Sequence, residues 1–196
     1  YVFADPERKN NRFADTFYGI ASAKNVGEIK DVQLKKMGSP WSNVTAADSS
    51  GNVLYSNISV TANITDKQLN DCVVTSKAKQ FMDYDVTVLD GSRAYCAWTI
   101  DKHEPYEGII PSKNRPWSIR KDVMFNSNDS HWYHTLDQKD KSENFAKVIG
   151  PEKTTRGERT RVAAYYAKSI INGSEITGSK GATPLKFEYL PPALAV

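Results

Sequence analysis

The residues best suited to chemistry lie in the stretch NDSHWYHTLDQKD, residues 128–140, which holds two of the three histidines in the chain. His131 and His134 are three positions apart, so a helix would place both rings on one side. Asp129 or Asp137 could then act as a third ligand, and such a set suits zinc or another transition metal. The same polar and aromatic stretch also fits an exposed turn, so both interpretations stay open.

A nucleophile assisted by a histidine base is the second chemistry to consider. Ser130 precedes His131, but adjacency alone does not supply the oriented base and third group that such catalysis needs. His103, Glu104 and Glu107 carry suitable groups, although a neighbouring proline and glycine indicate a loop. The chain lacks a Gly-x-Ser-x-Gly elbow, a phosphate-binding loop and a metalloprotease helix motif. We therefore expect a protein without enzymatic activity, and with no catalytic or cofactor-binding residues.

Length and composition bound the class of protein. With 196 residues, of which 39% are hydrophobic and 25% charged, the chain suits one soluble α+β domain spanning residues 1–196. Prolines and basic residues near 104–116 permit a sub-boundary there. Apolar runs fall far short of the roughly 20 residues that span a membrane, and no signal peptide is visible. A net charge of +3 without a dominant basic cluster argues against nucleic acid as a partner.

The cysteine usage favours an oxidising compartment. Cys72 and Cys96 are the only two cysteines, and they are accompanied by five Asn-x-Ser/Thr sequons, at Asn43, Asn57, Asn63, Asn128 and Asn172. Such an excess is typical of a secreted glycoprotein or of an Asn-rich bacterial extracellular surface. We predict a Cys72–Cys96 disulfide and an extracellular or cell-surface location. The aromatic stretches near Trp117 and Trp132 could include a sugar-stacking platform.

Capping and periodicity predict the elements in the first half of the chain. Asp5 and the proline that follows it start an amphipathic helix predicted over 6–24. Residues 28–37 fit either a strand or a continuation of that helix. The turn formers of 38–52 predict a loop with at most a short strand, and residues 53–64 predict a strand.

Two stronger local signals follow. Thr65 and Gln68 have the spacing of a capping box, which predicts a helix start and turns Cys72 inward. Asp90-Gly91 between two β-branched and aromatic runs predicts a hairpin with a type I′ turn. Further along the chain the patterns predict a short helix near 143–149, an element over 159–171 that fits helix or strand, and a strand at 185–190.

The segment NISVTANITDKQLNDCVVTSKAKQFMDYDVTVLDG, residues 57–91, resembles the central region of type IVb pilins. The resemblance rests on a strand, the capped helix with Cys72, the aromatic residues Phe81 and Tyr84, and a second strand ending at Gly91. It implies a minor or divergent pilin with an α+β fold, in which an N-terminal amphipathic helix packs on an antiparallel sheet.

These observations lead to one main functional prediction and two alternatives. We predict an extracellular, non-enzymatic structural or adhesion protein, a pilin-like fimbrial subunit that contacts other protein subunits or host surface glycans. Membrane contact would occur only through a segment absent from this chain. One alternative is a secreted or viral β-rich glycoprotein or capsid-like domain. The other is a small secreted hydrolase that uses His131 and His134.

Overall fold

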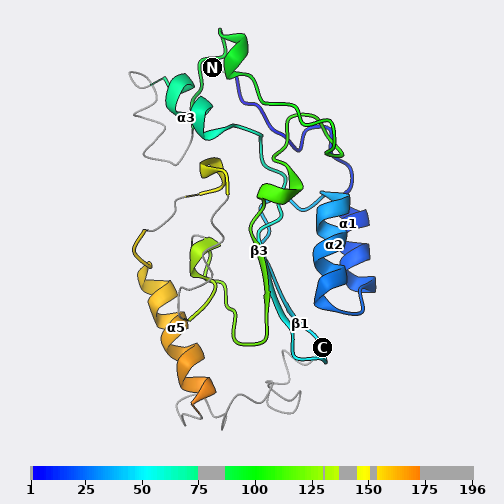
Figure 1. The fold of residues 1–196 in the computed structure, drawn as a ribbon, viewed down its shortest axis with the longest axis vertical. Coiled ribbons are helices and arrows are strands. Elements are labelled where there is room, and N and C mark those ends of the chain that lie inside the picture. Colours follow the sequence, from blue (N-terminus) through cyan, green and yellow to red (C-terminus); the bar gives the residue numbers. More distant parts are fainter. Residues whose placement is uncertain (1, 75–86, 130, 137–144, 151–153, 173–196) are drawn as a thin grey trace.

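The structure is a computed structural model that describes residues 2–74, 87–129, 131–136, 145–150 and 154–172 (Figure 1). It has the predicted α+β fold, with helices around a small antiparallel sheet. The helices and strands are α1 (Phe13–Ser22), α2 (Val26–Lys36), β1 (Val44–Ala47), β2 (Val53–Ser56), α3 (Asp66–Cys72), β3 (Trp117–Arg120) and α5 (Glu158–Ile171). Four 3-10 helices cover Ala94–Cys96, Ser112–Asn114, His131–Tyr133 and Lys147–Ile149.

The three strands pair in the order β1-β2-β3. β1 and β2 form a hairpin in which Val44 lies opposite Ser56, and β2 pairs antiparallel with β3 so that Ser56 also lies opposite Trp117. The hairpin turn is held by Asp48, whose carboxylate accepts hydrogen bonds from the backbone N–H and the side-chain amide of Asn52. The strand predicted over 53–64 is therefore regular only in its first four residues.

The helix predicted over 6–24 is confirmed only for Phe13–Ser22, and the segment 28–37, which fitted a strand or a continued helix, is helical. α1 begins only at Phe13, and α2 is a separate helix whose start is capped by the Asn25 side chain, which accepts from the Glu28 N–H. α1 packs on α2, and α2 packs against β2 and β3 (Figure 1). The helix that faces the sheet is thus α2, an arrangement different from the pilin-like packing expected for the N-terminal helix.

The central core lies where α2 ends. Its buried apolar side chains come from three segments of the chain and are Met37, Ile58, Val60 and Ile109. The partly buried Leu34 and Tyr106 pack against them. The buried Arg115 guanidinium crosses this region and donates hydrogen bonds to the backbone carbonyls of Ser59 and Ile110. Burial lowers the pKa of Arg115 to about 10. Segment 104–116 therefore shares its core with residues 58–60, and we retain the single domain over 1–196 as a proposal.

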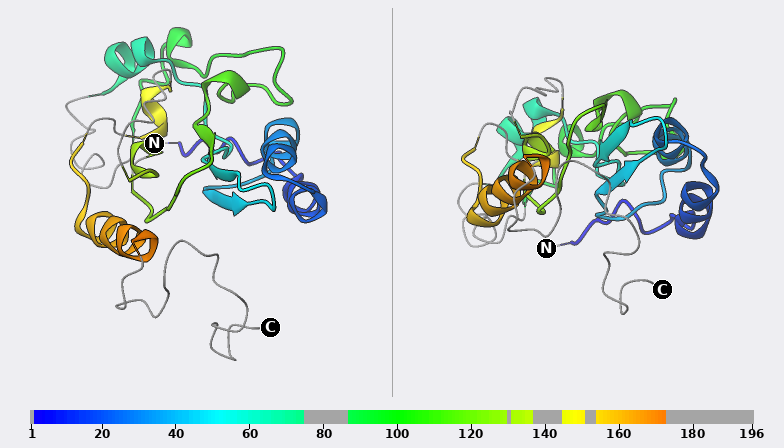
Figure 2. Two further views of the ribbon diagram at one scale, coloured as in Figure 1. Left: turned by 60° about the horizontal axis from the view of Figure 1, so that its bottom comes forward. Right: turned by 90° about the horizontal axis from the view of Figure 1, so that it is seen from below.

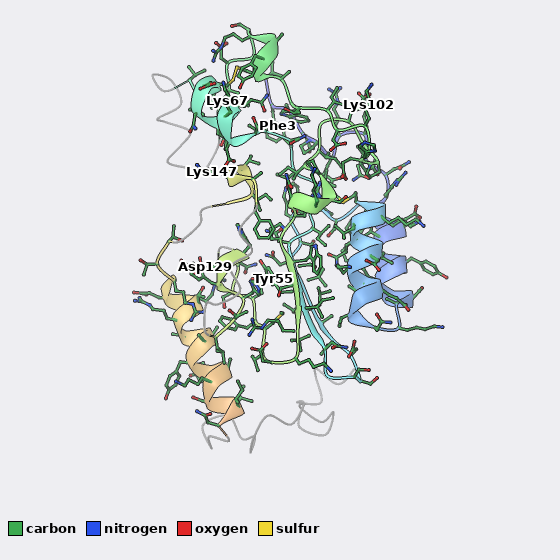
Figure 3. The ribbon with its side chains drawn as sticks, in the orientation of Figure 1. Phe3, Tyr55, Lys67, Lys102, Asp129 and Lys147 are labelled. Carbon is green, nitrogen blue, oxygen red and sulfur yellow. A yellow bond between two sulfur atoms is a disulfide. The ribbon has the colours of Figure 1, made fainter. Side chains whose placement is uncertain are left out.

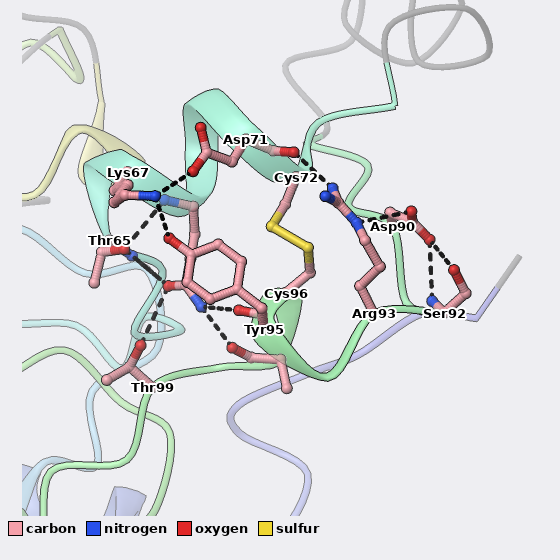
Figure 4. The surroundings of a disulfide bond; sticks show 12 residues. Thr65, Lys67, Asp71, Cys72, Asp90, Ser92, Arg93, Tyr95, Cys96 and Thr99 are labelled. Carbon is pink, nitrogen blue, oxygen red and sulfur yellow. Dashed lines mark hydrogen bonds and ion pairs between the residues drawn. A yellow bond between two sulfur atoms is a disulfide. The ribbon is translucent and has the colours of Figure 1, made fainter.

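The start of α3 has the predicted capping box. The Thr65 hydroxyl accepts from the Gln68 N–H, and the Gln68 side chain in turn accepts from the Thr65 N–H (Figure 4). Cys72, at the end of this helix, is buried and joined to Cys96 by a disulfide with a Cα–Cα distance of 5.6 Å. The fold therefore includes the one disulfide expected for it.

The prediction of a hairpin around Asp90-Gly91 is wrong, because the described residues on the two sides of this dipeptide do not pair with each other. Leu89 pairs with Val73 instead, and the Asp90 N–H donates to the Cys72 carbonyl. The chain then enters the 3-10 helix Ala94–Cys96, where the Gln68 side-chain amide donates to the carbonyls of Tyr95 and Ala97 (Figure 4). A buried side-chain amide on α3 thus binds two carbonyls of the segment predicted as the second hairpin strand.

The ambiguous segment near the C-terminal end of the described chain is a helix, α5. Viewed from two further directions, α5 lies on the side of the molecule opposite to α1 and α2 (Figure 2). The short helix expected near 143–149 is the single 3-10 turn Lys147–Ile149. The strand predicted at 185–190 and the aromatic residues Phe81 and Tyr84 lie outside the described residues. None of the helices in the described chain has the length and apolarity needed to cross a membrane.

Candidate functional site

A loop of residues 124–135, here called the site loop, follows β3 and closes on itself. Met124 forms an antiparallel bridge with Thr135, and the Phe125 N–H donates to the His134 carbonyl at 3.0 Å. The loop therefore has a fixed neck, so its tip is held in one place relative to the sheet. Its surface encloses a hollow too narrow for a water molecule, lined by Tyr55, Phe125, Asn126, Ser127, Asp129, Tyr133 and His134.

The tip of the site loop holds a non-glycine residue in the left-handed region. Asn128 has φ 54°, and its backbone N–H donates to Asn126 Oδ1 at 2.9 Å. Asparagine tolerates this conformation better than other residues with a side chain, although the conformation remains costly and clusters at functional sites. Both side chains are exposed, so the turn presents two carboxamides to solvent.

Two buried histidines lie at the base of the site loop and support it. His131 and His134 are only 2% and 3% exposed. His134 Nδ1 lies 2.6 Å from the His131 carbonyl oxygen. Because a carbonyl only accepts, Nδ1 is the donor in this contact. The His134 ring stacks on Tyr55 of β2 at 4.3 Å, and the His131 ring packs edge-on against Phe145 at 5.0 Å.

Burial keeps the His131 ring uncharged at neutral pH. Desolvation, together with a smaller contribution from the nearby His134, lowers the pKa of His131 to about 4. Burial also raises the pKa of Tyr55, whose hydroxyl donates to Asn43 Oδ1 at 3.2 Å. The stacked rings of Tyr55 and His134 thus support the loop from the side of the sheet.

Asp129 ties the site loop to the start of α5. Its Oδ2 accepts from the Gly157 N–H at 2.9 Å and from the Thr160 hydroxyl at 2.5 Å. In Figure 3, Asp129 lies beside the first turn of α5, while Tyr55 lies on the sheet. The carboxylate satisfies a free N–H at the helix start and suits the helix dipole. Its role within the described structure is that of a helix cap.

Arg156 clamps the same loop immediately before α5. Its guanidinium carbon lies 5.8 Å from the ring centre of Phe125 and 5.7 Å from that of Tyr133, so the cation contacts two aromatic faces. One of its N–H groups donates to the Thr135 carbonyl at the neck of the loop. The site loop is therefore held by β2 on one side and by residues 156–160 on the other.

The side chains predicted as possible metal ligands in this stretch make other contacts in the structure. His131 and His134 do share one turn, but the Nδ1 of His134 faces a carbonyl and Asp129 caps a helix. The described part of the chain contains no group of three or more His, Cys, Asp or Glu side chains arranged to hold a metal ion. Asp137 and Ser130 lie outside the described residues.

The other histidine, His103, lies in a separate open cleft of about 520 Å³. Its side chain is exposed, and its backbone N–H donates to Asp101 Oδ1. Glu104 accepts from the Ser112 N–H and hydroxyl, and Glu107 is exposed. These groups form a solvated loop, as the neighbouring proline and glycine predict.

One of the sequon asparagines and one tryptophan of the proposed sugar platform have structural roles. The Asn63 side chain is buried and donates to the Thr99 carbonyl at 2.9 Å, so it is unsuited to glycosylation. The Trp117 ring lies under Lys30 of α2, with 4.6 Å between the ammonium and the ring centre. That contact fixes α2 to β3.

Comparison with known proteins identifies the class. A sequence model of the penicillin amidase family matches residues 2–169, which include the sheet, the site loop and most of α5. The chain is 32% identical over 187 residues to aculeacin-A acylase of Actinoplanes utahensis, covering 95% of this chain and 24% of that enzyme. It is 32% identical over 163 residues to the acyl-homoserine lactone acylase PvdQ of Pseudomonas fluorescens Pf0-1, covering 83% and 20%. A second Pseudomonas fluorescens PvdQ, from strain Pf-5, is 35% identical over 132 residues, covering 67% and 16%.

This chain belongs to the penicillin amidase family, a family of enzymes. The resemblance to type IVb pilins is therefore wrong, and so is the prediction of a non-enzymatic fimbrial or adhesion subunit. The capped helix and Cys72 that suggested a pilin are present, but residues 58–60 lie outside the regular strands, and the chain is a member of the penicillin amidase family. The hydrolase alternative agrees with the family. The chain spans about a quarter of the length of the relatives it matches most fully.

Two residues of the site, Asn128 and Arg156, are not identified by the sequence patterns. Asn128 stands out in the sequence only as part of a sequon. The signal available in the sequence was the concentration of polar residues and two histidines between aromatic neighbours in 125–135. No local pattern indicates that Arg156 returns to this loop.

Proposed function

We propose that this chain contributes the site loop to the active site of an acylase, an enzyme that hydrolyses an amide bond between an acyl group and an amine. The observation that supports this most directly is the agreement between the family match and the geometry. The matched range contains a fixed loop that presents carboxamides at its tip and rests on two buried histidines. The relatives are named as acylases of acyl-homoserine lactones and of aculeacin A, so compounds of this kind are the first substrates to test.

Within this site we assign Asn128 as a donor to the transition state. Amide hydrolysis places negative charge on the former carbonyl oxygen, and fixed N–H donors aimed at that oxygen lower the barrier. An exposed carboxamide in a backbone conformation held by Asn126 and by the loop neck meets this need without reorganising. Asp129 and Arg156 act as positioning residues, because they hold the loop and have no role in the proposed contact with substrate.

The disulfide supports a location outside the reducing cytosol, where Cys72 and Cys96 remain oxidised. We propose a location outside the cytoplasm for this acylase. The expected contacts with other protein subunits or with host glycans stay predictions.

The test is an Asn128→Ala substitution in the intact protein that carries this chain. Using an acyl-homoserine lactone as substrate, we expect kcat to fall about 100-fold with KM changed little, because the lost donor acts mainly in the transition state. Asn172→Ala, another exposed asparagine at the end of α5, is the matched control and should leave both constants unchanged. A kcat for Asn128→Ala within twofold of the parent enzyme would remove Asn128 from the proposed mechanism.

A further inference from the structure

Helix α5 carries an apolar stripe on its solvent-facing side, which we call the α5 stripe: Val162, Tyr165 and Tyr166. Their spacing of three and four positions places them side by side on one helix face. They are 53%, 59% and 47% exposed, and the two tyrosine rings contact each other edge-on at 5.9 Å. An isolated exposed apolar residue is ordinary, but a contiguous patch of large side chains indicates a contact surface.

The opposite side of α5 is already used for packing within the chain. Thr160 is buried and bonded to Asp129 of the site loop, and the alanines at 163, 164 and 167 on the same side are half-buried. A helix with apolar side chains on both sides is normally enclosed between two layers. The described residues supply only one of those layers.

Members of this family have polypeptide that could supply the second layer. The chain covers 24% of aculeacin-A acylase and 20% of a PvdQ acylase, so these relatives have about three-quarters of their length beyond the matched region. The α5 stripe is bordered by cationic side chains at Arg159, Arg161 and Lys168, all exposed. Of these, Arg161 lies 3.8 Å from Glu158. The attraction between the two charges is weak because both side chains are exposed to water, which screens them. A matching surface would therefore be apolar at its centre and acidic at its edge.

We propose that the α5 stripe is the surface through which this chain packs on the further polypeptide that a penicillin amidase has beyond these residues. Because Asp129 fixes the first turn of α5 to the site loop, this packing also sets the position of the site loop relative to that polypeptide. The inference goes beyond the proposed chemistry, since it requires family membership but no particular role for Asn128.

The experiment measures thiol labelling in the intact protein that carries this chain. Cys72 and Cys96 are joined to each other, so a single introduced cysteine is the one free thiol that this chain contributes. Tyr165→Cys tests the stripe, and Ser50→Cys, at an exposed position in the turn between β1 and β2, is the control. We expect a maleimide to modify Tyr165→Cys at least 10-fold more slowly than Ser50→Cys in the native protein, and at a similar rate in urea.

Two results would overturn the proposal. Equal native rates for the two variants would show that the stripe is open to solvent. Protection that is lost on dilution, together with a dimeric mass at high concentration, would show that a second copy covers it. A measurement without substitution guards against misfolded variants: hydroxyl-radical footprinting of the unmodified protein should find Tyr165 and Tyr166 protected relative to the unfolded state. Oxidation at the unfolded rate would also contradict the proposal.

Discussion

The Thr160 hydroxyl donates a hydrogen bond of 2.5 Å to Asp129 Oδ2, and this contact joins the site loop to the first turn of α5. Thr160 is only 2% exposed, so the bond lies away from competing water. Asp129 also accepts from the Gly157 N–H, and one carboxylate therefore serves a loop and a helix start together. The position of α5 and the shape of the site loop are consequently linked.

A pair of substitutions at Thr160 tests this link. Thr160→Val keeps the side-chain shape but removes the hydroxyl, and we expect it to lower the free energy of unfolding by about 1–3 kcal/mol, the cost of losing a hydrogen bond to a charged acceptor. Thr160→Ser keeps the hydroxyl and should lose less. Urea denaturation followed by circular dichroism measures both. Equal losses for the two variants would mean that packing, and not the hydrogen bond, makes Thr160 important.

Arg156 gives a prediction about activity. Arg156→Ala removes the cation between Phe125 and Tyr133 and the donor to the Thr135 carbonyl, so the neck of the site loop loses a support. We expect kcat of the intact acylase to fall 10-fold or more, because small misplacements of catalytic groups are costly. Arg156→Lys should recover part of this, since it keeps the charge but not the planar donor fork.

The control for that experiment is Arg159→Ala, an exposed arginine one turn further along the chain. It should change kcat and KM by less than twofold. If Arg159→Ala reduced activity as much as Arg156→Ala, the effect would come from net positive charge and not from the position of the site loop.

The parts of the fold that the sequence predicts depend on neighbours in the chain. The capping box of Thr65 and Gln68 is found because both partners lie within one helical turn. The hairpin at Asp90-Gly91 is missed because Gln68, more than 25 positions away, donates to the carbonyls of Tyr95 and Ala97. Local turn preference loses to two buried long-range hydrogen bonds.

The candidate site shows the same limit. The two histidines are found by residue type and spacing, but their role depends on contacts with Tyr55 and Phe145, which no periodicity reveals. Asp129 has the right chemistry for a metal ligand, but in the structure it caps α5. There it accepts a hydrogen bond from Thr160, which lies 31 positions further along the chain. The family assignment required comparison with relatives because this segment holds none of the short catalytic motifs that a sequence search can recognise alone.

Gly38 gives a prediction about packing. A Cβ added there would lie 2.3 Å from the backbone oxygen of Arg12, and that oxygen is fixed because it accepts from the Thr16 N–H at the start of α1. Gly38→Ala should therefore destabilise the protein by about 1–3 kcal/mol, the usual cost of forcing extra atoms into a packed region. Gly91→Ala, where an added Cβ meets no atom within 4 Å, is the control and should be nearly neutral in the same urea titration.

The buried His131 predicts how stability depends on pH. Its pKa is about 4 in the folded protein, because burial and the neighbouring His134 disfavour the charged ring, against an ordinary value of 6.5. Between these values the unfolded chain binds a proton that the folded chain does not, so the stabilising effect is complete above pH 6.5 and is lost as the pH falls towards 4. We expect this histidine to account for a loss on the order of 2 kcal/mol over that range.

Urea denaturation at several pH values between 7.5 and 4 measures this loss. His131→Gln has no titrating ring, so its stability should fall less steeply over the range, whereas His103→Gln, at an exposed position, should follow the parent protein. The comparison separates His131 from carboxylates that also titrate near pH 4, because those are present in all three proteins. Parallel curves for the parent and His131→Gln would show that the histidine does not determine the acid sensitivity of this fold.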